Sequence, residues 1–247
     1  MFLRTGLPLR LENSRLVFRG MPSVAPAFRT AKELKDVATV TMPDNEILYA
    51  MYRNIQRPEH RELFRQRKVR YDITVMLPRM LGAEYPKTVG HYHSLSLKVS
   101  FPEVYEVLYG RAHFLLQQGK GRIIEDAAVV AAQAGDVVIV PPDYGHITIN
   151  PSREVLVLGN LIAVNAQSDY KLMLKYRGGA YFETPKGFVP NRKLKSPPLR
   201  LLNARRLGRM GTKSPLYSAF AKNPETFDFL TNPEKHLKDL KRVLPKK

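Results

Sequence analysis

Short apolar, β-branched segments recur along the middle of this chain, and several of them alternate with polar residues as half-buried strands do. Turn-forming Gly, Pro and Asn residues separate the segments, and no helical pattern of ten or more residues intervenes. We therefore expect an all-β barrel or sandwich and not a parallel sheet with crossover helices. The expected strands cover residues 69–78, 103–110, 111–118, 122–132, 136–141, 146–150 and 154–164.

The two ends of the chain have a different pattern. Residues 1–45 are expected to form an N-terminal arm with one short helix, because Thr30 and Glu33 have the spacing of a capping box. Leu34 and Val37 would share the buried face of that helix. Residues 46–183 would form the β domain, and residues 184–247 a Pro-rich, basic C-terminal extension. Short helices are expected within residues 223–244, where Pro twice stands in a first-turn position before Glu.

Charge is concentrated in the C-terminal extension. The chain has a net charge of +18, and residues 186–247 contain 16 Lys and Arg against four Asp and Glu, a net +12. A basic segment can bind nucleic acid or an acidic membrane surface. We favour an extension that wraps the domain or a neighbouring subunit, because it carries no nucleic-acid motif and no evenly spaced basic helix.

Composition narrows the class of protein further. Hydrophobic residues make up 44% of the chain, which is enough for a substantial core, yet no run approaches eighteen apolar residues. The first twenty residues are interrupted by arginines and Pro8 and lack an apolar secretory core. Cysteine is absent, which excludes disulfides and thiolate metal sites. We expect a cytoplasmic protein without a membrane span.

Two separated blocks carry the candidate chemistry. The first contains His91, His93 and Glu103, and the second contains His146. Three imidazoles and one carboxylate suit a borderline divalent cation. On a strand, His91 and His93 project to the same face, where buried imidazoles need hydrogen bonds or a metal. A His-x-His pair alone is weak evidence, but the other two residues strengthen it.

The spacing of these blocks resembles the two motifs of the cupin superfamily. Glu103 is followed by Gly110 after six residues, and Gly135, Pro141, His146 and Asn150 follow one another at intervals of six, five and four. The resemblance implies a cupin jelly-roll barrel in which three His and one Glu bind a single metal ion.

Two positions depart from the cupin pattern. Nine residues separate His93 from Glu103, where cupins usually have three or four, and Tyr85 stands where the first motif usually has Gly. Leu97 and Lys98 cannot supply the carboxylate. Residues 94–102 must therefore bulge as a longer loop before the strand that carries Glu103.

The amino-acid sequence around the two motifs resembles one particular cupin family. The segments TVGHYH, PEVYEVLYGRAHFLLQ and VPPDYGHITIN, with RTAKELKDV and ILYAMYR upstream, are similar to the cupin-type glucose-6-phosphate isomerases of archaea and some bacteria. The likeness runs from about Arg29 to Glu183 and leaves out the basic extension. It implies a glycolytic and gluconeogenic enzyme that interconverts glucose 6-phosphate and fructose 6-phosphate.

The resemblance also implies roles for particular residues. A metal ion would be bound by His91, His93, Glu103 and His146. Glu103 and Tyr105 would be the catalytic residues, with Tyr105 on the same strand face. The sugar phosphate would lie near Tyr49, Thr74, Thr88 and the backbone of Gly90. Ser168 stands where archaeal members have a histidine, which puts an acid–base role at this position in doubt.

The chemistry of these groups agrees with isomerisation. A cation held by neutral imidazoles can polarise the carbonyl, and a carboxylate beside C1 and C2 can move the proton. Glu103 would have to loosen from the metal to act as the base, and a hydride shift is the rival mechanism. Lys87 or Arg79 could help to bind the phosphate.

We expect one divalent ion per subunit, Fe²⁺ before Mn²⁺, Zn²⁺, Ni²⁺ or Co²⁺, and a homodimer. Two alternatives stay open: a non-haem metal oxygenase or oxidase on the same barrel, and a non-catalytic, sugar-binding cupin. Oxygen consumption would identify the first, and binding without turnover the second. Fold alone cannot decide among them, since one barrel hosts many chemistries.

Overall fold

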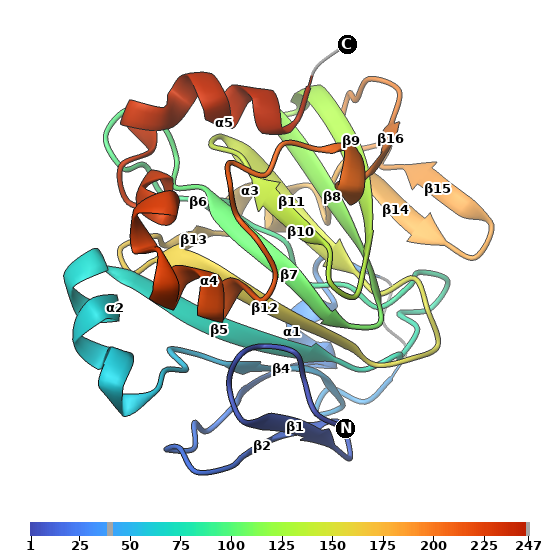
Figure 1. The fold of residues 1–247 in the computed structure, drawn as a ribbon. Helices are drawn as coiled ribbons and strands as arrows, with labels where there is room; N and C mark the ends of the chain where they lie inside the picture. The colour runs from blue at the N-terminus through green and yellow to red at the C-terminus, as the bar shows by residue number, and fades with distance from the viewer. Residues whose placement is uncertain (39–41, 246–247) are drawn as a thin grey trace.

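Two β-sheets form the centre of the molecule (Figure 1). The computed structural model describes residues 1–38 and 42–245. All pairings in the larger, six-stranded sheet are antiparallel. Its strands lie in the order β10 (Val137–Val140), β7 (Glu103–Tyr109), β12 (Leu156–Ala163), β5 (Val69–Met76), β4 (Ile47–Tyr52) and β3 (Ala27–Thr30).

The smaller sheet faces the larger one across a shared core. The rings of Tyr105 in β7 and Phe114 in β8 lie 5.3 Å apart between centroids. The first three strands of the smaller sheet pair antiparallel, and the fourth pairs in parallel with β9. Its strands lie in the order β11 (Tyr144–Ile149), β8 (Arg111–Lys120), β9 (Ile123–Gln133) and β16 (Arg200–Asn203).

The predicted all-β class is confirmed, and β5 and β7 to β12 match the seven expected strands. The chain crosses from the larger sheet to the smaller one at Gly110, where it leaves β7 and enters β8. Gly110 has a φ of +85°, and a Cβ there would lie 2.7 Å from the carbonyl oxygen of Val155, so this crossing requires glycine. Among the strands of the described residues, no ladder closes the two sheets into a continuous barrel.

The N-terminal residues cover one edge of the larger sheet. A hairpin of β1 (Leu9–Glu12) and β2 (Arg15–Phe18) precedes β3, which pairs with β4. Helix α1 (Ala31–Leu34) begins with the predicted capping box, in which the backbone N–H of Thr30 donates to Oε2 of Glu33 at 2.9 Å. Leu34 and Val37 are fully buried, as predicted.

Several short elements lie between the strands of the larger sheet or follow them. They are the 3-10 helix η1 (Pro58–His60), α2 (Arg61–Arg67), β6 (Tyr92–His93), β13 (Ser168–Asp169), α3 (Lys171–Lys175), β14 (Tyr181–Thr184) and β15 (Gly187–Pro190). The sequence pattern predicted neither α2 nor the hairpin of β14 and β15.

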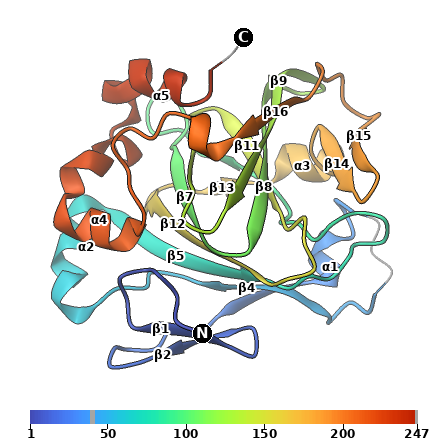
Figure 2. The ribbon, with the colours of Figure 1, turned by 45° about the vertical axis from the view of Figure 1, so that its right-hand side comes forward.

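The C-terminal extension packs against both sheets. Strand β16 extends the smaller sheet, and α4 (Leu216–Lys222) lies beside α2 (Figure 2), where the rings of Phe64 and Tyr217 stack. The predicted short helices within residues 223–244 are confirmed, with Pro in the first turn of η3 and η4. After β16 the elements are the 3-10 helix η2 (Ala204–Arg206), α4 (Leu216–Lys222), η3 (Pro224–Leu230), η4 (Pro233–His236) and α5 (Leu237–Val243).

Buried polar contacts fix the extension to the domain. The carboxylate of Glu106 in β7 accepts hydrogen bonds from the hydroxyl of Ser214 and, at 2.7 Å, from the backbone N–H of Leu216. The guanidinium of Arg200 forms a bidentate pair with Asp126 at 2.7 and 3.0 Å.

The division into residues 1–45, 46–183 and 184–247 stays a prediction. None of the helices within residues 1–38 and 42–245 has the length and apolar character needed to span a membrane.

Candidate metal centre

The four predicted metal ligands converge between the two sheets. One ligand atom from each of His91, His93, Glu103 and His146 lies within 4.8 Å of the other three. Glu103 begins β7 of the larger sheet, whereas His146 belongs to β11 of the smaller sheet. His93 ends β6, a two-residue strand that lies beside β11. The two distant sequence blocks therefore form one cluster.

Backbone pairing brings His91 beside His146. Each residue donates its N–H to the carbonyl oxygen of the other, at 3.2 and 3.0 Å. Gly90 makes this approach possible, because its φ is +79° and a Cβ would lie 2.4 Å from the side chain of Ile147. Glycine at position 90 therefore lets the two histidine-bearing segments pair, whereas the predicted contact of its backbone with the sugar phosphate stays a prediction.

Further hydrogen bonds orient the side chains of the cluster. Nδ1 of His93 lies 2.8 Å from the carbonyl oxygen of Phe101 and must donate to it, so Nε2 of a neutral His93 carries the lone pair. The amide of Asn160 donates to Oε1 of Glu103 at 2.6 Å. The hydroxyl of Tyr105 lies 3.1 Å from Nε2 of His146. Oε2 of Glu103 is left facing the imidazoles.

Burial and mutual contact set the charges of this cluster. Burial lowers the pKa of His91 well below 6.5, and the neighbouring His146 and His93 lower it further. Burial also lowers the pKa of His146. Burial opposes ionisation of Glu103, but contacts with His146 and His93 lower its pKa well below 4.5. The cluster therefore offers the neutral imidazoles of His91 and His146 and the ionised carboxylate of Glu103.

This donor set fits a single divalent cation. Oε2 of Glu103 is buried and has no hydrogen-bond partner, although it lies 3.3 Å from Nε2 of His93 and 3.4 Å from Nε2 of His146. Nε2 of His91 lies 3.2 Å from Nε2 of His93. Adjacent donors on an ion with bonds of about 2.1 Å stand about 3 Å apart, which is close to these separations. The cluster is a possible metal site.

The predicted substrate residues line one pocket beside this cluster. Burial raises the pKa of Tyr105 well above 10, so its hydroxyl keeps the proton at neutral pH. Tyr49 is also buried, and burial raises the pKa of its hydroxyl. The predicted residues that line the pocket are Tyr49, Thr74, Thr88, Gly90 and Tyr105, together with His91, Glu103 and His146.

Three other predicted positions lie in different surroundings. Ser168 lines the same pocket and pairs with His93 in the β13–β6 ladder. Lys87 is buried away from it and donates to Glu84 and, at 2.9 Å, to the carbonyl oxygen of Val37. Arg79 forms an ion pair with Glu46 at 2.5 Å and lines a separate groove. Lys87 and Arg79 therefore bind other groups of the protein and do not line the pocket in which the phosphate was expected.

Sequence reasoning missed several polar residues of the pocket. Arg70 and Asp72 lie on the same face of β5 as Thr74, since alternate residues of a strand share a face. That periodicity was a usable signal. Asn160 lies opposite both Asp72 and Tyr105 in the ladders of β12, a placement that only strand pairing reveals. The missed residues of the pocket also include Arg29, Arg53 and Tyr170.

Solved structures resemble this chain over part of its length. Vicilin from Capsicum annuum superposes with a TM-score of 0.39 and 17% identity, over 59% of this chain and 32% of its own. An oxalate decarboxylase from Lactobacillus farciminis, in a formate complex, superposes with a TM-score of 0.39 and 16% identity, over 61% of this chain and 36% of its own.

Sequence comparison identifies the family. The sequence model "Glucose-6-phosphate isomerase (GPI)" matches residues 23–198. A glucose-6-phosphate isomerase of Thermococcus litoralis is 32% identical over 160 residues, 65% of this chain and 76% of that protein. The glucose-6-phosphate isomerase of Pyrococcus furiosus is 30% identical over 127 residues, 51% of this chain and 60% of that protein. The predicted resemblance is confirmed, and this chain belongs to the glucose-6-phosphate isomerase family.

Proposed function

We propose that this chain interconverts glucose 6-phosphate and fructose 6-phosphate with the help of a divalent cation bound by His91, His93, Glu103 and His146. The observation that carries the proposal is the convergence of these four ligand atoms beside a pocket, in a member of the glucose-6-phosphate isomerase family.

The cation we propose is Fe²⁺, with Mn²⁺, Zn²⁺, Ni²⁺ and Co²⁺ as alternatives that the same donors accept. When bound, it would polarise the sugar carbonyl and offset negative charge on the oxygens of C1 and C2. Neutral imidazoles suit this task because they leave the ion its positive charge. The lowered pKa values of His91 and His146 keep both side chains in that neutral form.

Glu103 is the residue that we propose to move the proton between C1 and C2. Asn160 holds Oε1, whereas Oε2 has no hydrogen-bond partner. Oε2 would therefore be the oxygen that leaves the metal ion when sugar binds and then acts as the base. A carboxylate that takes a proton from one carbon can return it to the next. Tyr105 lies on the same strand two residues away and keeps its hydroxyl proton, so it can orient Glu103 and donate to a sugar oxygen.

The phosphate group would lie among the hydroxyls of Tyr49, Thr74 and Thr88 and the backbone of Gly90. Arginines at the same pocket support an anionic ligand. Both Arg53 and Arg70 pair with the single carboxylate of Asp72, which leaves one positive charge in excess. Such an excess attracts a phosphate at low salt.

A coupled assay tests the activity. The full-length protein should convert fructose 6-phosphate to glucose 6-phosphate, lose this activity on chelation, and regain it when single metals are added back, Fe²⁺ first. His91→Ala should lose bound metal and activity together. Oxygen consumption with an organic substrate, or sugar-phosphate binding without turnover, would contradict the proposal and support one of the two alternative cupin functions.

Solvent deuterium tests the role of Glu103. Turnover in D₂O should introduce deuterium at C1 or C2, because a proton held on a carboxylate can exchange with solvent. Complete retention of the original hydrogen would instead support a hydride shift.

The proposed homodimer and cytoplasmic location stay predictions, and sedimentation equilibrium would test the homodimer.

A further inference from the structure

The loop between two of the metal ligands is held from outside the domain that the family model covers. Residues 94–102 separate His93 from Glu103, and the bridge between Leu95 and Ser100 closes them into a narrow excursion. Leu97 at its tip is 77% exposed. Apolar packing therefore does not fix the tip of this loop.

Glu234 of the C-terminal extension holds the tip instead. Its Oε1 accepts a hydrogen bond from the backbone N–H of Leu97 at 2.8 Å. The same carboxylate is also hydrogen-bonded to the side chain of Ser96 and the backbone of Lys98. Burial opposes ionisation of Glu234, but these bonds and one to its own backbone N–H lower its pKa. One carboxylate thus binds three successive residues of the loop.

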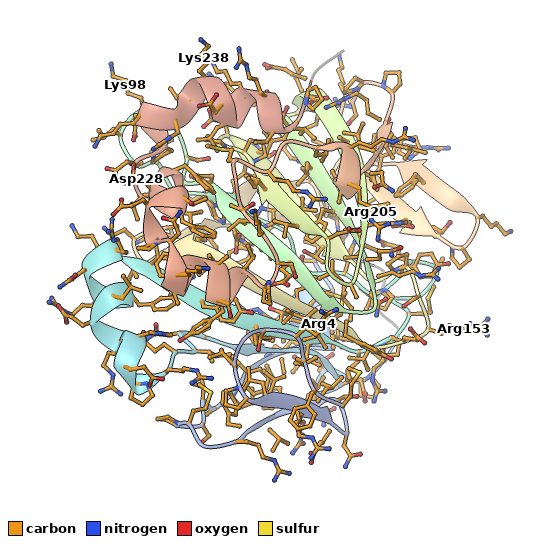
Figure 3. The ribbon with its side chains drawn as sticks, in the orientation of Figure 1. Arg4, Lys98, Arg153, Arg205, Asp228 and Lys238 are labelled. Carbon is orange, nitrogen blue, oxygen red and sulfur yellow. The ribbon has the colours of Figure 1, made fainter. Side chains whose placement is uncertain are left out.

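The segment that carries Glu234 is itself held by side-chain contacts on either side of it. Glu234 belongs to η4, which lies beyond residues 23–198 of the family match. His236 in η4 contacts one oxygen of Asp228 at 2.8 Å, and Asn232 donates to the other, also at 2.8 Å. Figure 3 labels Lys98, Asp228 and Lys238 at the corner where the extension meets the loop. The extension therefore places Glu234 on a 3-10 helix that these contacts hold to Asp228.

The base of the loop leads directly to the ligands. The carbonyl oxygen of Phe101 accepts the Nδ1 proton of His93. Ser100 exchanges hydrogen bonds with Asp143, at 3.0 Å from its N–H and 2.6 Å to its hydroxyl, and Asp143 lies three residues before His146. The base of the loop therefore contacts both His93 and the segment that leads to His146.

We propose that Glu234 is a positioning residue for the metal centre: by binding residues 96–98, the C-terminal extension keeps His93 aimed at the cation. The inference rests on the proposed metal site and extends it. Residues that hydrogen-bond to a metal ligand typically raise the affinity for the metal about tenfold or more. Glu234 acts one step further away, so we expect about a threefold to tenfold effect.

Two measurements test this on the full chain. In the metal-free protein, Glu234→Ala should accelerate hydrogen exchange of the Leu97 and Lys98 amides. After loading with Co²⁺, the same variant should release the ion to a coloured chelator about threefold to tenfold faster than the wild type. Glu234→Gln keeps one acceptor oxygen, so its rate of Co²⁺ release should lie between those of the wild type and Glu234→Ala. A control, Glu225→Ala, breaks the ion pair of the extension with Arg67 and should release Co²⁺ at the wild-type rate.

The outcomes separate this inference from the proposed function. If Co²⁺ binds the wild type but Glu234→Ala releases it at the same rate, Glu234 only tethers the loop and the inference is overturned. The same holds if Glu225→Ala accelerates release equally, because the effect would then come from general loosening of the extension. If the wild type takes up no Co²⁺, the metal site itself is refuted and this inference with it.

Discussion

The carbonyl oxygen of Phe101 lies 2.8 Å from Nδ1 of His93 and decides which nitrogen of that imidazole faces the cluster. Nδ1 carries the proton, so Nε2 presents its lone pair 3.3 Å from Oε2 of Glu103. The arrangement resembles the support that metal-binding histidines usually receive from a backbone carbonyl. It explains why the loop before Glu103 matters to the chemistry of the site.

Metal binding should stabilise the folded protein. A ligand that binds only the native state at 100 times its dissociation constant adds about 2.7 kcal/mol to the free energy of unfolding. Addition of Fe²⁺ or Co²⁺ should therefore raise Tm by several degrees, and chelation should reverse the shift. His91→Ala should show no metal-dependent shift. An equal shift in this variant would mean that the ion binds elsewhere.

Replacement of Asn160 should impair the centre without removing a ligand. Its amide donates to Oε1 of Glu103 at 2.6 Å. Asn160→Ala should weaken metal binding about tenfold to a hundredfold. Asn160→Asp should be worse for turnover, because a second carboxylate would repel Glu103 and compete for its proton. Metal titration and kcat of the two variants check this; wild-type affinity in both would mean that Asn160 does not hold Glu103.

Glu106 should make stability depend on pH. Burial raises its pKa to about 6, although the bonds from Ser214 and Leu216 lower it. Since an unfolded Glu titrates near 4.5, the folded state binds more protons between the two values. The stabilisation from the neutral form is complete below about 4.5 and is lost as pH rises through about 6, a change of about 2 kcal/mol.

Glu106→Gln tests this prediction, because it cannot titrate and can still pair with Ser214 and Leu216. Urea unfolding at pH 4.5, 5.5 and 7 should show a smaller loss of stability with rising pH in the variant, by about 2 kcal/mol over the range. Identical pH profiles for the variant and the wild type would show that Glu106 has an ordinary pKa in the folded protein.

Arg200 should link the extension energetically to the smaller sheet. It pairs with Asp126, which also accepts a hydrogen bond from Tyr144 at 2.6 Å. Arg200→Ala should lower the free energy of unfolding by about 2 kcal/mol, less than for a fully buried pair because the side chain is 15% exposed. The double variant with Asp126→Asn should lose less than the sum of the single variants. Strict additivity in urea unfolding would argue against coupling.

The sequence alone determined the class of fold, the four residues of the buried His and Glu cluster, and the family. Strand periodicity is local, so β5 and β7 to β12 could be located by pattern, and the capping box of α1 depends on residues only three apart. The four residues of the cluster were identifiable because imidazoles and a carboxylate are rare inside apolar strands and their spacing matches a known motif. The family match over residues 23–198 confirms the predicted family.

Only the tertiary structure decided which residues support the four side chains of that cluster. Asn160 meets Glu103 because β12 and β7 are neighbours, and Lys87 turns inward to Glu84 and not toward the pocket. Glu234 reaches Leu97 across 137 positions of sequence. Such partners are chosen by strand pairing and by the need to satisfy buried polar groups, and both depend on the whole folded chain, which no local spacing encodes.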